Sequence, residues 1–186
     1  MGTAVIVLIL LVGAAGVAIY NRLIRGRNRV DTAWSDIDVQ LQRRHDLVPQ
    51  LVKAVDHYAR YEKATLEAVT ELRAEAIRAA DVRTRGTAEE ALSAGVERLL
   101  VLAEDYPDLK ANENFLALQR ELVETEDYLQ FARRYYNGSV RDYNTMIESV
   151  PSNIVAGMFG FRMRDFFQKS SDEAANVPLA RFGGVE

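Results

Sequence analysis

The sequence contains no cysteine and only two histidines among its 186 residues. The absence of cysteine excludes disulfide bonds, thiolate zinc sites, iron–sulfur clusters and a cysteine nucleophile. A net charge of −4 provides no basic surface for nucleic acid. The motifs of di-metal carboxylate sites, phosphate-binding loops and nucleophile elbows are also missing from the sequence. We therefore predict that the protein is not an enzyme and has no catalytic residues, metal site, cofactor or small-molecule substrate.

Charge is absent from residues 3–20, which are almost entirely apolar. A helix of this length rises about 27 Å, close to the roughly 30 Å hydrocarbon core of a bilayer. A cleaved signal peptide would require a positively charged start, and no basic residue precedes Arg22. A core helix would show a polar face. We predict a transmembrane anchor over residues 1–21, a helical domain over 22–168 and a flexible polar tail over 169–186.

Four arginines follow the anchor directly, whereas its other flank has no basic residue. They are Arg22, Arg25, Arg27 and Arg29. The positive-inside rule places the N-terminus outside and the helical domain in the cytoplasm. The arginines either only fix this orientation or also bind anionic lipid headgroups. The sequence thus predicts a single-pass membrane protein with the lipid bilayer as one partner.

Apolar residues recur in steps of four and three over residues 30–76, 88–106 and 111–150, alternating regularly in the first of these and with adjoining steps of four in the third, from 132 to 140. The first stripe predicts a long helix that continues from the anchor and is kinked or broken at Pro49. A polar gap over 81–86 precedes the second helix, which a capping box from Thr87 to Glu90 would open. We found no strand-forming run. The predicted fold is all-α, with a transmembrane helix that continues into an elongated antiparallel bundle of three to four long, coiled-coil-like helices.

The third helix carries additional apolar residues beside its main stripe. They are Leu116, Val123, Tyr128, Phe131 and Tyr135. A face this broad predicts contact with more than one neighbouring helix. Residues 152–167 form a second apolar cluster, which either caps the open end of the bundle or docks onto a membrane or partner. Its candidate surface residues are Phe159, Phe161, Phe166 and Phe167.

Arg44 lies on the apolar stripe of the first helix, where an unpaired charge would be costly. We predict that it pairs with a carboxylate across the bundle, with Glu121 and Glu124 as candidates. The alternative is that its long side chain reaches water. His45 and His57 are interpreted as residues of the bundle surface or edge.

Several long segments, in this order, resemble the LemA family of bacterial membrane proteins. They are RNRVDTAWSDIDVQLQRRHDLVPQLV, EKATLEAVTELRA, YPDLKANENFLALQRELVETED, YNGSVRDYNTMIESVPSNIVAGMFGF and RDFF, within residues 20–167. VPLARF, at 177–182, resembles the motif that closes such proteins. The resemblance implies a bacterial inner-membrane protein with one N-terminal membrane helix, a cytoplasmic bundle of long antiparallel helices and no established enzymatic activity. Some relatives take part in magnetosome membranes or are encoded beside membrane proteases.

Two functions are consistent with these features. The first is a membrane-anchored scaffold or adaptor whose cytoplasmic bundle forms a homo-oligomer or binds protein partners, and which could organise or shape the membrane. The alternative is a regulator of a membrane protease or of an envelope-stress signalling system, linked to the bilayer by its continuous first helix. In either case we expect a second copy or another membrane protein as partner.

Overall fold

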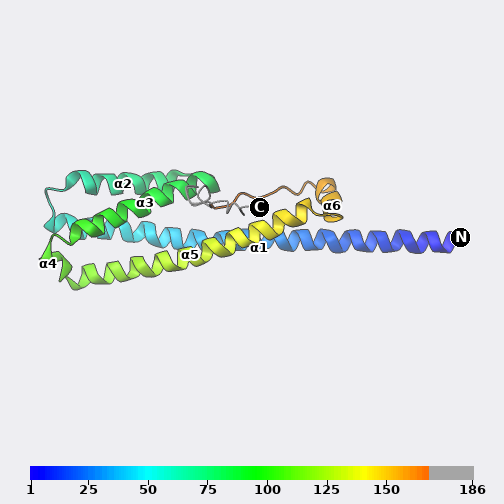
Figure 1. The fold of residues 1–186 in the computed structure, drawn as a ribbon, viewed down its shortest axis with the longest axis horizontal. Coiled ribbons are helices and arrows are strands. Elements are labelled where there is room, and N and C mark those ends of the chain that lie inside the picture. Colours follow the sequence, from blue (N-terminus) through cyan, green and yellow to red (C-terminus); the bar gives the residue numbers. More distant parts are fainter. Residues whose placement is uncertain (168–186) are drawn as a thin grey trace, which may run out of the picture.

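A computed structural model of the protein describes residues 1–167, and within them the chain is all-α, as predicted. Figure 1 shows an elongated molecule in which the start of α1 projects alone from one end of a helical bundle. The predicted tail over residues 169–186 lies outside the described residues. The helices are α1 (Gly2–Tyr58), α2 (Lys63–Arg78), α3 (Val82–Ala103), α4 (Pro107–Lys110), α5 (Glu113–Glu148) and α6 (Ser152–Met158).

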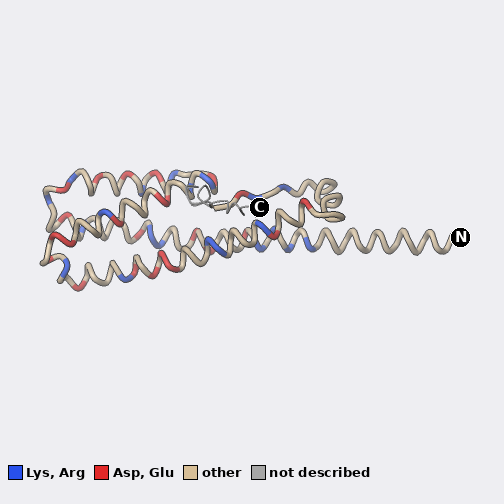
Figure 2. Tube along the Cα trace, in the orientation of Figure 1, with Lys and Arg blue, Asp and Glu red and all other residues tan. Residues whose placement is uncertain are grey.

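The projecting part of α1 has the length and composition of a membrane span. Its apolar window has a mean hydropathy of 2.6, and none of that window is buried against the rest of the protein. A core helix of a soluble domain would be mostly buried, so burial cannot account for these apolar side chains. Lysine, arginine, aspartate and glutamate are absent from this part of the trace in Figure 2. As predicted, α1 continues from it into the bundle without a break.

The sequence predicted either a kink or a break at Pro49. The helix does not break there, because α1 remains helical through that position. Proline has no N–H to donate to the carbonyl four residues earlier, which here belongs to His45. Arg73 of α2 donates to that carbonyl oxygen instead, over 2.6 Å. The Pro49 ring faces solvent, while its neighbours Leu47 and Val48 are buried in the core. Packing and a replacement donor therefore keep the helix intact.

The predicted first helix does not reach residue 76, because α1 ends at Tyr58 and the chain folds back into α2. The turn over residues 59–62 contains neither glycine nor proline. The Ala59 amide donates to the carbonyl of Val55 over 2.8 Å, and the Glu62 amide donates to the carbonyl of Ala59 over 3.0 Å. The apolar stripe continues through the turn because α1 and α2 pack on the same core.

The predicted gap over 81–86 and the capping box at Thr87 are also wrong. The side chain of Asp81 caps α3, accepting from the backbone amides of Arg83 and Thr84 over 3.0 and 2.9 Å. The Thr84 hydroxyl donates to the same carboxylate, and this hydrogen bond is the main cause that lowers the pKa of Asp81. The cap of the helix is therefore Asp81, six residues before the predicted cap at Thr87, and Gly86 is buried inside the helix.

α5 packs against α1, and the α2–α3 hairpin packs on the half of α1 that lies far from the anchor (Figure 1). The buried apolar residues form two clusters along this arrangement. The anchor-proximal core joins α1, α5 and the chain after α6, and includes Val30, Ile37, Leu129, Tyr143 and Phe167. The distal core contains residues from each of the helices α1, α2, α3, α4 and α5. It includes Val48, Leu51, Leu92, Leu99, Phe115 and Leu122.

Residues 159–167 follow α6 and run back along the bundle (Figure 1); we call this segment the strap. Asn137 holds the strap at Phe167, donating to its carbonyl oxygen over 3.0 Å and accepting from its amide over 2.9 Å. Asn144 holds Arg164 in the same way, with both hydrogen bonds at 2.9 Å. The strap thereby seats Phe167 beside Trp34, with 5.7 Å between the ring centroids.

Candidate functional site

One candidate surface consists of exposed apolar side chains along α5, which we call the outer face of α5. Helical periodicity places these residues beside and away from the buried stripe that packs on α1, on the sides of α5 that face solvent. Each of them is 40–63% exposed. They are Leu116, Val123, Tyr128, Phe131 and Tyr135.

This face has no second helix against it within the described chain. α5 packs on α1, and more briefly on α4 and α6. The prediction that the broad face contacts more than one neighbouring helix is therefore not met within a single copy. Charged residues of both signs lie among the apolar ones, and the Arg134 guanidinium sits 4.7 Å from the centre of the Phe131 ring. The face combines exposed apolar area with polar groups, as protein interfaces do.

The phenylalanine cluster after Pro151 is partly core and partly surface. Phe167 is 2% exposed, so its assignment to an interaction surface is wrong for this chain. Phe159 and Phe161 pack on Tyr20, with ring centroids 4.8 and 5.6 Å apart, at the end of the anchor. Phe159 remains 60% exposed and Phe166 39%. The segment packs on both α1 and α5 and leaves apolar side chains exposed beside the apolar part of α1.

The four flanking arginines point in two directions. Arg22, Arg25 and Arg29 line a groove between α1 and the last turns of α5. Arg27 points elsewhere, with its guanidinium carbon 5.9 Å from the centre of the Phe161 ring.

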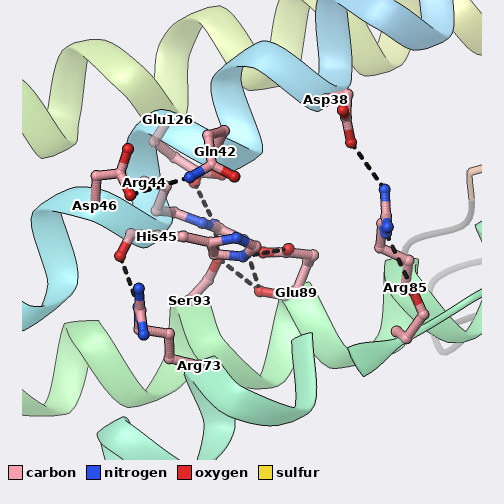
Figure 3. Close-up of polar contacts among 11 residues, drawn as sticks. Asp38, Gln42, Arg44, His45, Asp46, Arg73, Arg85, Glu89, Ser93 and Glu126 are labelled. Atoms are coloured by element: carbon pink, nitrogen blue, oxygen red, sulfur yellow. Dashed lines mark hydrogen bonds and ion pairs between the residues drawn. The ribbon is translucent and has the colours of Figure 1, made fainter. Parts of the chain in front are cut away.

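A polar layer separates the two apolar cores, and Figure 3 shows its contacts. Arg44 of α1 pairs with Glu89 of α3, and both side chains are buried, at 3% and 0% exposure. Nη1 of Arg44 also donates to Glu126 of α5 over 3.0 Å and to the Ser93 hydroxyl over 2.5 Å. Nε2 of His45 lies 2.7 Å from the second oxygen of Glu89. The layer thus ties three helices together at one level of the bundle.

The layer is balanced electrostatically around the Glu89 carboxylate. Burial acts to raise the pKa of Glu89, but the hydrogen bond from His45 and the charge of Arg44 outweigh it and lower that pKa. The carboxylate is therefore ionised, and as an acceptor it requires Nε2 of His45 to carry the proton. Burial lowers the pKa of nearby Arg133, whose guanidinium lies over the Phe167 ring at 5.1 Å.

The prediction that Arg44 pairs with a carboxylate across the bundle is confirmed. Its partners are Glu89 and Glu126 rather than the predicted Glu121 or Glu124. Glu124 pairs instead with the exposed Arg43. His57 is exposed, as interpreted, whereas His45 is 6% exposed and belongs to the layer. One signal could have identified Glu89. When α3 is taken to begin at Val82, as it does in the structure, Glu89 lies on the buried stripe of that helix.

The polar layer is best interpreted as structural. Its carboxylates are engaged by arginine and histidine, and no group of three or more potential metal ligands occurs among residues 1–167. Surface features are thus the better candidates for function, namely the outer face of α5 and the groove beside the anchor.

Comparison with models of known protein families identifies a match to one family. The sequence matches the LemA family over residues 33–182, which includes most of the helical domain. Magnetosome protein MamQ 2 of Paramagnetospirillum magneticum is 24% identical, and the alignment covers 86% of this chain and 68% of the relative. Magnetosome protein MamQ of Magnetospirillum gryphiswaldense has the same identity and coverage. Protein LemA of Metamycoplasma hominis is 26% identical, over 84% of this chain and 72% of the relative.

Proposed function

Because the chain belongs to the LemA family, we propose that it is a membrane-anchored, non-enzymatic scaffold whose helical bundle associates with further copies of itself. The observation that carries the proposal is the outer face of α5, which stays exposed after the rest of the chain has packed. Contiguous exposed apolar residues rimmed by polar ones mark interaction sites on soluble surfaces. Such a scaffold would organise the membrane that holds it.

The anchor restricts how two copies can meet. Copies inserted in one membrane with the same orientation have parallel α5 helices, and a two-fold axis along the membrane normal relates them. The interface is then isologous, so each residue near the axis lies opposite its own counterpart. Burial of each Å² of apolar surface contributes about 25 cal/mol, which favours covering Val123 and Phe131.

Light scattering on the detergent-solubilised full-length protein tests the proposal. We expect an oligomer for the wild type and a monomer after Val123→Glu with Phe131→Glu, because two carboxylates would be desolvated at the interface. Val101→Glu on α3 is the matched control, since Val101 is also an exposed valine, at 62% against 60% for Val123. A wild-type monomer, or equal loss of the oligomer with Val101→Glu, contradicts the proposal.

We further propose that the N-terminus lies outside and the bundle in the cytoplasm of a bacterial cell. The arginines after the anchor support this orientation. The chain lacks cysteine, so single substitutions give a direct test. A membrane-impermeant maleimide should label Gly2→Cys in intact cells and should label Val101→Cys only after lysis. Labelling of Val101→Cys in intact cells would overturn the orientation.

One feature supports the alternative role, regulation of a membrane protease. The uninterrupted α1 extends from the anchor to the far end of the bundle, so displacement of the anchor could be transmitted over its whole length. A regulator of this kind would co-purify with a substoichiometric membrane protein while remaining monomeric itself. The light-scattering experiment therefore separates the two roles.

A further inference from the structure

The groove between α1 and α5 lies at the point where the membrane span ends. It has a volume of about 780 Å³ and is lined by one face of α1, from Ile19 to Arg29, and by residues of the last turns of α5 and the start of α6. Gly26 forms part of its wall. A Cβ at that position would lie 2.5 Å from Cε of Met146, so glycine allows the two helices to approach closely there.

Positive charge is concentrated in this groove. Arg22, Arg25 and Arg29 contribute from one face of α1, and Arg141 contributes from α5. Among the described residues, Asp142 is the one carboxylate that lines the groove, which leaves an excess of positive charge. None of the four arginines forms an ion pair with another residue in the described part of the chain. Guanidinium groups without a carboxylate partner suit a phosphate, which they bind through bidentate hydrogen bonds.

The depth of the groove matches the headgroup layer. With a rise of 1.5 Å per residue, Arg22 and Arg25 lie about 3 and 8 Å beyond Tyr20, the last residue of the uncharged span. The headgroup layer extends about 5–8 Å from the hydrocarbon core on each side. Ile19 and Leu23 add apolar walls at the membrane end of the groove, where acyl chains would continue along the exposed anchor.

We propose that this groove binds the phosphate of one anionic phospholipid, with Arg22 and Arg25 on one wall and Arg141 on the other. Thr145 and Ser149 line the α5 side and offer hydroxyl groups to the rest of the headgroup. The site depends on the anchor but not on self-association through the outer face of α5. The membrane end of the bundle would then bind anionic phospholipid selectively, in addition to connecting the bundle to the membrane.

Native mass spectrometry of the full-length protein in detergent tests this site. The probes are phosphatidylglycerol and phosphatidylcholine with the same acyl chains, and inorganic phosphate. We expect one phosphatidylglycerol to be retained and phosphatidylcholine to be lost. Arg25→Gln and Arg141→Gln should each raise the apparent Kd for phosphatidylglycerol about fivefold. A large excess of inorganic phosphate should not displace the lipid, because it lacks the acyl chains.

Arg27→Gln is the matched control. It removes the same charge from the same flank, but Arg27 lies over Phe161 and outside the groove. If Arg27→Gln weakens binding as much as Arg25→Gln, attraction is diffuse and the site is refuted. Equal retention of phosphatidylcholine, or displacement by phosphate, also overturns it. Circular dichroism of each variant verifies that the helices are intact. The native mass spectra also report the oligomeric state, so failure of the lipid site and failure of self-association can be observed separately.

Discussion

Arg73 donates a hydrogen bond of 2.6 Å from its Nε to the backbone carbonyl oxygen of His45, across the α1–α2 pair. That carbonyl is the one that Pro49 leaves without its helical donor. A side chain of α2 thus takes the place of a backbone amide of α1. The hydrogen bond explains how one helix can run from Gly2 to Tyr58 with a proline in its interior.

Arg73→Met should destabilise the protein by about 1–3 kcal/mol, because a partly buried carbonyl loses its donor. In a Pro49→Ala background the cost should be smaller, since the alanine amide can restore the helical bond. Unfolding of the full-length protein in detergent, followed by circular dichroism, measures this double-mutant cycle. Arg78→Met is the control, because Arg78 donates to a carbonyl of its own helix. Equal costs of Arg73→Met in both backgrounds would contradict the account.

Glu89→Gln should destabilise the bundle by about 3–5 kcal/mol, because it leaves the Arg44 guanidinium buried with incomplete compensation. Replacing both partners, as Arg44→Met with Glu89→Leu, should recover most of that loss. The adjacent exposed pair of Arg43 and Glu124 is the control, and its removal should cost less than about 1 kcal/mol. A Glu89→Gln variant as stable as the wild type would refute the role assigned to the polar layer.

The stabilising effect of Glu89 should depend on pH. Its pKa in the folded protein lies below the ordinary 4.5, so its contribution is fully present above pH 4.5. The contribution is lost as the pH falls from 4.5 through the lower folded value. The stability difference between wild type and Glu89→Gln should therefore be constant at neutral pH and shrink in acid. A difference that persists unchanged as the pH falls well below 4.5 would be inconsistent with an ionised Glu89.

Asn137→Ala combined with Asn144→Ala should release the strap. The two amides make four hydrogen bonds to its backbone, worth about 1 kcal/mol each. Trp34 is the single tryptophan and packs against Phe167, so its fluorescence should shift to longer wavelength as the strap leaves. Asn114→Ala is the control, since Asn114 is an exposed asparagine near the start of α5. An unchanged tryptophan spectrum in the double variant would count against this role.

The periodic features of the sequence predicted most of the fold. The uncharged anchor, its continuation into α1 and the long α5 all follow from apolar spacing, which reports directly on buried faces. The turn after Tyr58 was missed because the apolar stripe crosses it without a change of period. Pro49 was misinterpreted because its replacement donor, Arg73, comes from another helix, and such a contact has no local signature.

The candidate site was less predictable from sequence. The prediction that Arg44 needs a carboxylate followed from the cost of a buried charge, but its choice of Glu89 depended on where α3 begins. The tyrosine–asparagine pairs at 136–137 and 143–144 repeat at seven residues, a signal that could have indicated the strap contacts. The groove beside the anchor joins residues more than a hundred positions apart, so only the fold reveals it.

Disulfide crosslinking in native membranes tests the central claim, self-association through the outer face of α5, most directly. The chain has no cysteine, so Phe131→Cys introduces the single thiol. In a parallel interface about a two-fold axis, residue 131 lies near its own counterpart. Mild oxidation should convert Phe131→Cys to a covalent dimer, while Val101→Cys, also exposed but on α3, should remain monomeric. Equal crosslinking at both positions, or none at residue 131, would contradict the proposed scaffold.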